Sequence, residues 1–391
     1  MRSVLYLAPF DPTVAGSGSS ARGRLVLDAL SRRYETHVVH LKSRHGGERD
    51  EALAGRLASL TAVDYSNAGY FLWSPALLRA AADVLQRHRI DFLFAEFEKA
   101  GGYAWRLSRR FGKPFFYASH NVEFRRSLDL ARGAPLRLAF VPWLYLLERQ
   151  ACRHAFATFA ISERDARVFR RWAPEGRVSV LPLAFDDEVF HPFYEGAASD
   201  PPVVLMVGNF GYAASREAAR LVRDRILPAV VARHPRAIFR FVGGGLPGDI
   251  RHPNVEAPGL VEALATEYRR ATVVIAPIAS GGGIKVKVIE ALAMGRFLVA
   301  TPKAMEGIDI KGLTHLTVSS LDRFAEEVAR ALDRRLGRSE ANWETISRRF
   351  GARHQGAVLL EKIESALSEL GGRGPAALTG HGNCSRKSYR P

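Results

Sequence analysis

The sequence of 391 residues has few cysteines and no long apolar run. Two cysteines, Cys152 and Cys384, exclude a disulfide-stapled scaffold and a four-cysteine zinc site, and favour a reducing compartment. No apolar run approaches the roughly 18 residues that a membrane-spanning helix needs, and the N-terminus lacks a signal-peptide pattern. The histidines show no metal-ligand spacing. We therefore expect a cytoplasmic protein, with no metal ion and no cofactor.

Acidic residues are also in short supply. The chain has 56 Lys and Arg against 40 Asp and Glu, a net charge of +16. Such a surplus attracts nucleic acid, anionic lipid or phosphorylated substrates, and it arises equally from codon bias in a GC-rich genome. No RNA-binding or zinc-finger signature accompanies it, so we expect no nucleic-acid partner.

Strand-like runs alternate with helix-length segments along the chain, which predicts an α/β fold with parallel sheets covered on both faces. The expected strands of the first half are Ser3–Ala8, His37–Leu41, Asp91–Glu96, Pro114–Ala118, Ala157–Ile161 and Val178–Leu181. The alternation pauses in a Pro-, Gly- and Asp-rich segment and resumes with the strands Val203–Val207, Ile238–Val242, Val273–Pro277 and Phe297–Ala300. We predict an N-terminal domain over 1–185, a linker over 186–202, a C-terminal domain over 203–370 and a disordered tail over 371–391.

The segment from Ser280 to Gly295 shows the strongest functional pattern: three glycines follow an apolar strand and open a helix. Backbone N–H groups at a helix start favour a phosphate, and glycine lets the ligand approach closely. Lys285 and Lys287 add cationic charge, and Glu290 can accept hydrogen bonds from the vicinal hydroxyls of a ribose. The alternative is a flexible loop with solvated lysines and a surface glutamate.

This segment and the two-half layout resemble the GT-B glycosyltransferases, and more narrowly glycosyltransferase family 4, the group 1 transferases. The resemblance runs over about residues 1 to 367 and includes Ser119-His-Asn-Val-Glu123, Val207-Gly-Asn-Phe210 and Phe241-Val-Gly-Gly-Gly245. It implies two Rossmann-like domains whose parallel sheets face an interdomain cleft, with C-terminal helices that return to the N-terminal domain. The family has two glutamates eight positions apart. Glu290 matches the second, which holds the ribose, whereas Gly282 stands where the first contacts the donor sugar.

The resemblance also assigns candidate residues in the first half. His120 follows an expected strand, at the edge where open α/β sheets bind ligands, and the family places such a histidine on the donor sugar. The alternative is a loop histidine bonded to local backbone. Gly16 and Gly18 resemble a dinucleotide fingerprint, but they follow the first strand by about eight residues, too far for that turn. The resemblance implies that they approach the donor diphosphate, and a plain flexible loop is the alternative.

The resulting hypothesis is a retaining glycosyltransferase that moves a sugar from a nucleotide sugar to an acceptor hydroxyl on a glycan, a lipid-linked molecule or a small molecule. His120 is the expected catalytic residue. The expected donor-binding residues are Gly16, Gly18, Gly208, Asn209, Gly282, Gly283, Ile284, Lys285, Lys287 and Glu290. The alternatives are a non-catalytic GT-B-like protein that binds a nucleotide or a partner, motivated by Gly282, and a nucleotide-sugar epimerase. The apolar run Leu136–Leu147 is either a buried helix or a face for peripheral contact with the inner side of a membrane.

Overall fold

The computed structural model describes residues 1–14, 18–42, 49–64, 74–131, 135–193, 199–281 and 283–373. The chain divides into two compact units: Met1–Pro182 together with the chain from Gly356 onward, and Leu183–Gln355. This division differs from the predicted boundaries in two places. The segment 186–202 is part of the second unit, and the chain after residue 355 belongs to the first.

The first unit is built on a seven-stranded parallel sheet with the order β3-β2-β1-β4-β5-β6-β7. Its strands are β1 Ser3–Ala8, β2 Glu35–Leu41, β3 Ser59–Val63, β4 Phe92–Glu96, β5 Phe115–Ala118, β6 Ala157–Ala160 and β7 Val178–Val180. The six predicted strands are confirmed to within two residues. The additional strand β3 lies at the sheet edge and is mostly half-exposed, so it lacks the apolar run that marks a central parallel strand.

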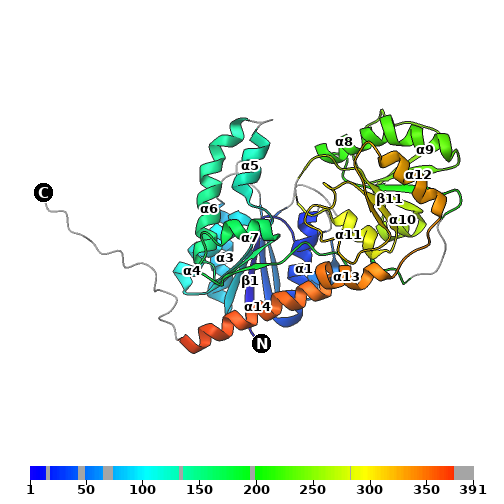
Figure 1. Cartoon of the computed structure of the whole chain (residues 1–391). Helices are drawn as coiled ribbons and strands as arrows, with labels where there is room; N and C mark the ends of the chain where they lie inside the picture. Colours follow the sequence, from blue (N-terminus) through cyan, green and yellow to red (C-terminus); the bar gives the residue numbers. More distant parts are fainter. Residues whose placement is uncertain are drawn as a thin grey trace, which may run out of the picture. The chain divides into compact units, whose positions relative to one another are not determined.

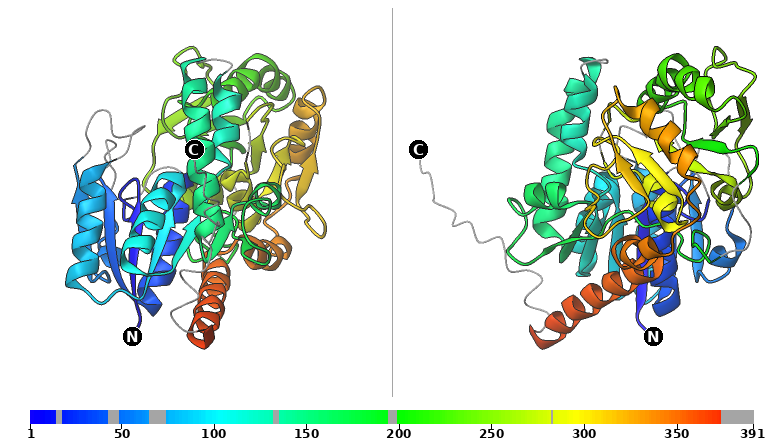
Figure 2. Two further views of the ribbon diagram at one scale, coloured as in Figure 1. Left: turned by 90° about the vertical axis from the view of Figure 1, so that its left-hand side faces the viewer. Right: turned by 45° about the vertical axis from the view of Figure 1, so that its right-hand side comes forward.

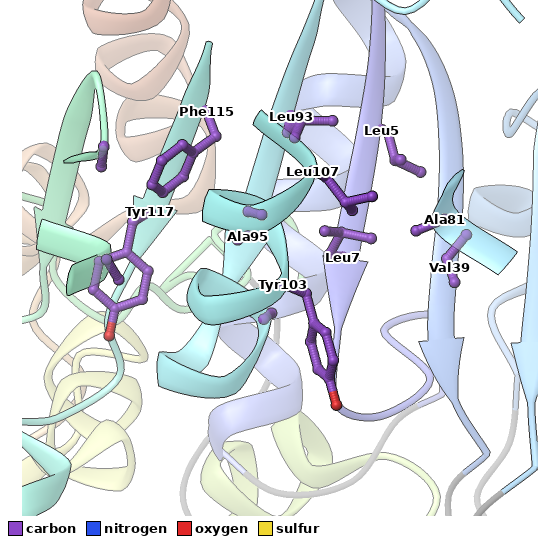
Figure 3. Packing of buried hydrophobic residues seen from close by; sticks show 14 of the residues in the cluster. Leu5, Leu7, Val39, Ala81, Leu93, Ala95, Tyr103, Leu107, Phe115 and Tyr117 are labelled. Carbon is purple, nitrogen blue, oxygen red and sulfur yellow. The ribbon is translucent and has the colours of Figure 1, made fainter. Parts of the chain in front are cut away.

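Helices cover both faces of this sheet. They are α1 Gly18–Arg33, α2 Glu51–Ala54, α3 Pro75–Arg87, α4 Phe97–Phe111, α5 Glu123–Ala131, α6 Val141–His154 and α7 Glu163–Phe169, with a 3₁₀ turn, η1, over Pro135–Phe140. Alternate residues of a strand face opposite sides of a sheet. On one side, Leu5 and Leu7 of β1 pack with Tyr103 and Leu107 of α4, as Figure 3 shows.

The other side of the sheet holds Val4 and Tyr6, and it is covered by α1 and by the last helix, α14 (Ala352–Arg373). Leu359 and Ile363 of α14 are fully buried in this layer, and Figure 1 shows α14 running along the first unit. The return of the C-terminal helix to the N-terminal domain is thus confirmed. The helix extends to Arg373, three residues into the segment 371–391 that we predicted as a tail; the rest of that segment lies outside the described residues.

The second unit repeats the architecture with a six-stranded parallel sheet of order β10-β9-β8-β11-β12-β13. Its strands are β8 Val203–Val207, β9 Ile238–Val242, β10 Val255–Gly259, β11 Val273–Ala276, β12 Phe297–Ala300 and β13 Leu316–Val318. Its helices are α8 Ala213–Leu221, α9 Leu227–Arg233, α10 Leu264–Arg270, α11 Val286–Ala293, α12 Phe324–Arg334 and α13 Ala341–Phe350, with a π-helical turn, η2, over Val222–Ile226.

The strand orders carry the main functional information of the fold. In each sheet the chain winds outward in one direction and then returns to continue in the other, so that β1 lies beside β4 and β8 beside β11. Ligands of open α/β sheets bind outside the carboxyl ends of the strands at this switch point. The predicted α/β fold with two Rossmann-like halves is confirmed, and each half offers one such binding edge.

The apolar run over 136–147 forms η1 and the start of α6. The helices α5 and α6 lie side by side and project beyond the sheet of the first unit, as the views of Figure 2 show. Leu144 and Leu147 are buried, whereas Leu138 and Leu146 are each 51% exposed. The segment therefore has one buried apolar face and one exposed apolar face. Among the described helices, none combines the length and apolar character needed to cross a bilayer.

Candidate active site

In the second unit, the predicted donor residues gather at the switch point between β8 and β11. Gly208 and Asn209 follow β8, and the glycine-rich turn before α11 follows β11. A Cβ added at Gly208 would lie 3.3 Å from Nζ of Lys287, on the first turn of α11. The structure therefore brings together two predicted residues that are 79 positions apart in the sequence.

The backbone around Gly208 is tightly packed. Gly208 donates its N–H to the Val242 carbonyl at 3.0 Å. Gly243 has a φ of +131°, and a Cβ there would lie 1.9 Å from the Gly208 carbonyl oxygen. Asn209 accepts the N–H of Gly211 through Oδ1 at 3.0 Å, which closes a local turn. The side chain of Asn209 thus shapes the loop, and Gly208 leaves room beside the lysine.

The two predicted lysines differ in their surroundings. The pKa of Lys287 is lowered to about 8, mainly by burial and also by the neighbouring charge of Lys285, and Glu290 opposes the change. Lys285 donates to the Gly283 carbonyl, and burial lowers its pKa as well. Two neighbouring lysine amines with lowered pKa values form a candidate anion-binding site, because a bound anion would favour the protonated form of both amines. Gly283 itself is exposed, and Gly282 lies outside the described residues.

The start of α11 adds backbone donors to this site. Lys285 is the N-cap residue, and it makes no side-chain capping hydrogen bond. The first N–H groups of a helix point along its axis and carry its positive dipole end, which favours a phosphate. Ile284, just before the cap, packs against the core of the second unit. That contact fixes the direction in which the helix begins.

Glu290 lies one turn into α11 and is held by a tyrosine. The hydroxyl of Tyr268, a fully buried residue of α10, donates to Glu290 Oε2 at 2.9 Å and lies 3.1 Å from the Lys287 carbonyl oxygen. Burial raises the pKa of Glu290 to about 7, although the Tyr268 hydrogen bond and the charge of Lys287 lower it. The half-buried carboxylate is thus poised to ionise near neutrality and can accept hydroxyl donors when ionised.

In the first unit, His120 lies just beyond the end of β5, at the edge where the predicted site belongs. It is 3% exposed, and its ring stacks on Phe97 with centroids 3.8 Å apart. Its Nε2 lies 3.5 Å from Oε1 of Glu96, the last residue of β4. Burial lowers the pKa of His120, while Glu96 acts in the opposite direction, so the imidazole is neutral at pH 7.

The N-terminal glycines are less informative. Gly16 lies outside the described residues. Gly18 is the first residue of α1 and therefore belongs to a helix.

Three residues that contact these sites were not predicted: Glu96, Tyr268 and Arg22, whose guanidinium donates to the carbonyl of Ser119, the residue before His120. Glu96 could have been predicted from the sequence. It is a charged residue at the end of the otherwise apolar strand Phe92–Glu96, and the carboxyl end of such a strand lies at a ligand-binding edge. Arg22 and Tyr268 left no such pattern. Their partners lie 97 and 22 positions away, and only the folded sheet brings them into contact.

The family comparisons bear directly on this arrangement. A family model described as "Glycosyl transferases group 1" matches residues 201–334. A second model, "Glycosyltransferase Family 4", matches residues 19–189. The first model spans all six strands of the second sheet, and the second model spans β2 to β7 of the first sheet. The chain belongs to the group 1, family 4-like glycosyltransferases.

Solved structures agree with this family in fold. Sucrose-phosphate synthase from Thermosynechococcus elongatus has 15% identity and a TM-score of 0.67, over 95% of this chain and all of that one. Anabaena HepE in complex with UDP-glucose has 15% identity and a TM-score of 0.63, over 93% and 100%. A glycosyltransferase from Rickettsia africae has 13% identity and a TM-score of 0.64, over 94% and 99%. No curated protein gives a significant sequence match. These likenesses show a GT-B fold for the glycosyltransferase.

Proposed function

We propose that this glycosyltransferase moves a hexosyl group from a nucleotide sugar to an acceptor hydroxyl, with retention of configuration and without a metal ion. The observation that carries the proposal is the meeting of Gly208, Lys287 and the start of α11 at the switch point of the second sheet. Retention is the expectation from the family resemblance. The HepE neighbour was crystallised with UDP-glucose, which makes a UDP-sugar the first donor to test.

The donor half of the site suits a nucleoside diphosphate. The bond between the anomeric carbon and the diphosphate oxygen breaks, and negative charge develops on that oxygen. Lys285, Lys287 and the N-terminal N–H groups of α11 are preorganised cationic and dipolar partners for that charge, and such groups can replace a metal ion. Glu290 would accept the ribose hydroxyls, and Tyr268 fixes its carboxylate for that role.

The first unit would supply the group that contacts the sugar. His120 is buried and neutral, so it can donate or accept a hydrogen bond without introducing a fixed charge beside the reacting carbon. The acceptor hydroxyl oxygen would form the new bond to the anomeric carbon as the bond to the diphosphate oxygen breaks, and the hydroxyl proton would pass to the departing diphosphate. We expect His120→Ala to reduce kcat more than it reduces nucleotide affinity. Equal losses would argue that the histidine only supports the fold.

The donor can be identified by thermal stabilisation against UDP-, GDP-, ADP- and TDP-sugars. A ligand at 100 times its Kd stabilises a folded protein by about 2.7 kcal/mol, so a true donor should stand out from its panel. Lys287→Ala is the matched variant and should lose most of that stabilisation. Release of nucleoside diphosphate from the stabilising donor would then demonstrate transfer or hydrolysis. Stabilisation without any release, across all acceptors tried, would indicate a binding protein.

The exposed face of the α5–α6 hairpin leads us to propose a peripheral contact with an anionic membrane, where a lipid-linked acceptor would be found. Leu146 is exposed and lies on the same helical face as the exposed Arg149, three positions away, and Leu128 of α5 is 43% exposed. Apolar side chains beside arginines suit an anionic interface. Leu146→Glu should reduce co-sedimentation with phosphatidylglycerol vesicles, and an unchanged bound fraction would refute the contact.

A further inference from the structure

The buried carboxylate of Glu96 has no part in the donor site described above. We propose that Glu96 is a positioning residue for His120: its carboxylate holds ring nitrogen Nε2 and leaves Nδ1 as the nitrogen offered to the sugar. The two groups lie on neighbouring strands, Glu96 at the end of β4 and His120 after β5, and Nε2 is 3.5 Å from Oε1.

The surroundings of Glu96 show a site built to enclose a carboxylate. The residue is fully buried, and the groups that face its carboxylate are the hydroxyl of Tyr6, the guanidinium of Arg22 and the ring of His120. A Cβ added at Gly23 would lie 2.8 Å from Oε2, so the carboxylate packs closely against the Gly23 backbone. Burying a carboxylate is costly, and such groups are frequent at functional sites.

Arg22 supplies the opposite charge and also fixes the loop that carries His120. Its guanidinium is fully buried and donates to the carbonyl oxygens of Ser119 and Phe159, the latter at 3.3 Å. The negative charge of Glu96 raises the pKa of Arg22 against the lowering by burial. The residue before His120 is thus anchored by a cation that faces the same carboxylate.

Phe97 limits the rotation of the His120 ring. The two rings are nearly parallel, with an interplanar angle of 11°. Phe97 has a φ of +68°, in the left-handed region that a non-glycine residue seldom adopts. Backbone strain of this kind is concentrated at functional sites. Here the Phe97 ring covers one face of the His120 imidazole, and the two ring nitrogens are left to make polar contacts.

The charged groups around His120 influence its pKa and the ring nitrogen that carries its proton. Glu96 from β4 and Glu123 from α5 raise its pKa, Arg22 from α1 lowers it, and burial lowers it most. Burial and the neighbouring Glu96 raise the pKa of the Tyr6 hydroxyl on β1, which donates to the Gly23 carbonyl at 3.4 Å. A neutral ring beside a carboxylate places its single proton on the nitrogen that faces the carboxylate. Nδ1 is then an acceptor for a sugar hydroxyl, a role that rests on the proposed function.

The test replaces the charge while keeping the shape. In Glu96→Gln, the pH midpoint of the His120 Hε1 resonance should move to lower pH, because the carboxylate that favours the imidazolium is gone. Glu98→Gln is the control: Glu98 is also a buried glutamate of this unit, and the midpoint should not move. Glu96→Asp keeps the charge and should give a smaller shift than Glu96→Gln. An unchanged or higher midpoint in Glu96→Gln overturns the proposal.

Activity provides the second measurement. With the donor that stabilises the wild type, Glu96→Ala should lower kcat by about 10- to 100-fold while the donor KM changes less than about threefold, because misplacing one reacting group costs rate rather than affinity. The acidic limb of the kcat profile should move to lower pH in Glu96→Gln. A matched rise in KM with unchanged kcat overturns the positioning role. If the wild type transfers no sugar, the proposed function fails, while the resonance still reports on the Glu96 contact.

Discussion

Glu290→Gln should make the protein more stable above neutral pH and less able to use its donor. Burial raises the pKa of Glu290 from 4.5 to about 7, so the ionised form is disfavoured in the folded state. Stability associated with this group is complete below pH 4.5 and is lost as the pH rises through 7. A shift of this size sets a ceiling of about 3 kcal/mol. Because the side chain is only half-buried, we expect about 1–2 kcal/mol at pH 8.

Glutamine cannot ionise, so the variant escapes this loss. Differential scanning fluorimetry of the ligand-free protein should show nearly equal melting temperatures at about pH 4, below the unfolded pKa, and a higher one for the variant at about pH 8, above the folded pKa. Glu344→Gln, an exposed glutamate of α13 in the same unit, is the control and should show no pH-dependent difference. A variant that melts at or below the wild type at pH 8 refutes the buried-carboxylate reasoning.

Activity should change in the opposite direction. The ionised Glu290 would form a charge-assisted hydrogen bond with the ribose, worth about 1.5–3 kcal/mol, so donor kcat/KM should fall by roughly 10- to 100-fold. Sites that bind ligands often accept such a stability cost. Donor kinetics identical to those of the wild type would remove Glu290 from the ribose site, whatever the melting curves show.

Three further expectations concern the same framework. UDP affinity, measured by calorimetry, should weaken as the pH rises through about 8, because Lys287 then loses its proton; a flat profile from pH 6.5 to 9.5 would contradict a phosphate contact. Gly208→Ala should keep its fold but bind UDP at least several-fold more weakly, since its Cβ would crowd the lysine amine, whereas Gly243→Ala should fail to fold stably because its Cβ meets backbone at 1.9 Å. Ile363→Ala, in the fully buried face of α14, should destabilise the first unit by about 2–4 kcal/mol in urea unfolding, and a change below 1 kcal/mol would show that the helix is not part of that core.

The parallel sheets were predictable because their strands are short, continuous apolar runs such as Ser3–Ala8 and Val203–Val207, which the structure reproduces residue for residue. The edge strands were not. β10 and β13 carry exposed or half-exposed residues, so neither has an apolar run to mark it. Helix starts were less certain than strands, since tertiary packing decides which turn is kept.

The arrangement of the candidate donor residues was predictable in part for a related reason. Lys285, Lys287 and Glu290 lie within one turn and one helix, and a short spacing holds their geometry. Tyr268 was not readable, because its contact with Glu290 depends on how α10 packs beneath α11. For Asn209 the position after β8 was predictable. The hydrogen bond that its Oδ1 accepts from the Gly211 N–H was not.

The return of α14 to the first unit has a consequence for synthesis on the ribosome. Val4 and Tyr6 belong to β1, yet the part of α14 that packs over them follows Gln355. After Pro182, about 170 residues of the second unit are synthesised before that part of α14, which at roughly 5–20 residues per second means a delay of about 10–35 s. During that interval one apolar face of the nascent sheet lacks its final cover. A chaperone that binds such faces would meet this chain at a defined length, and chains stalled before residue 356 should aggregate.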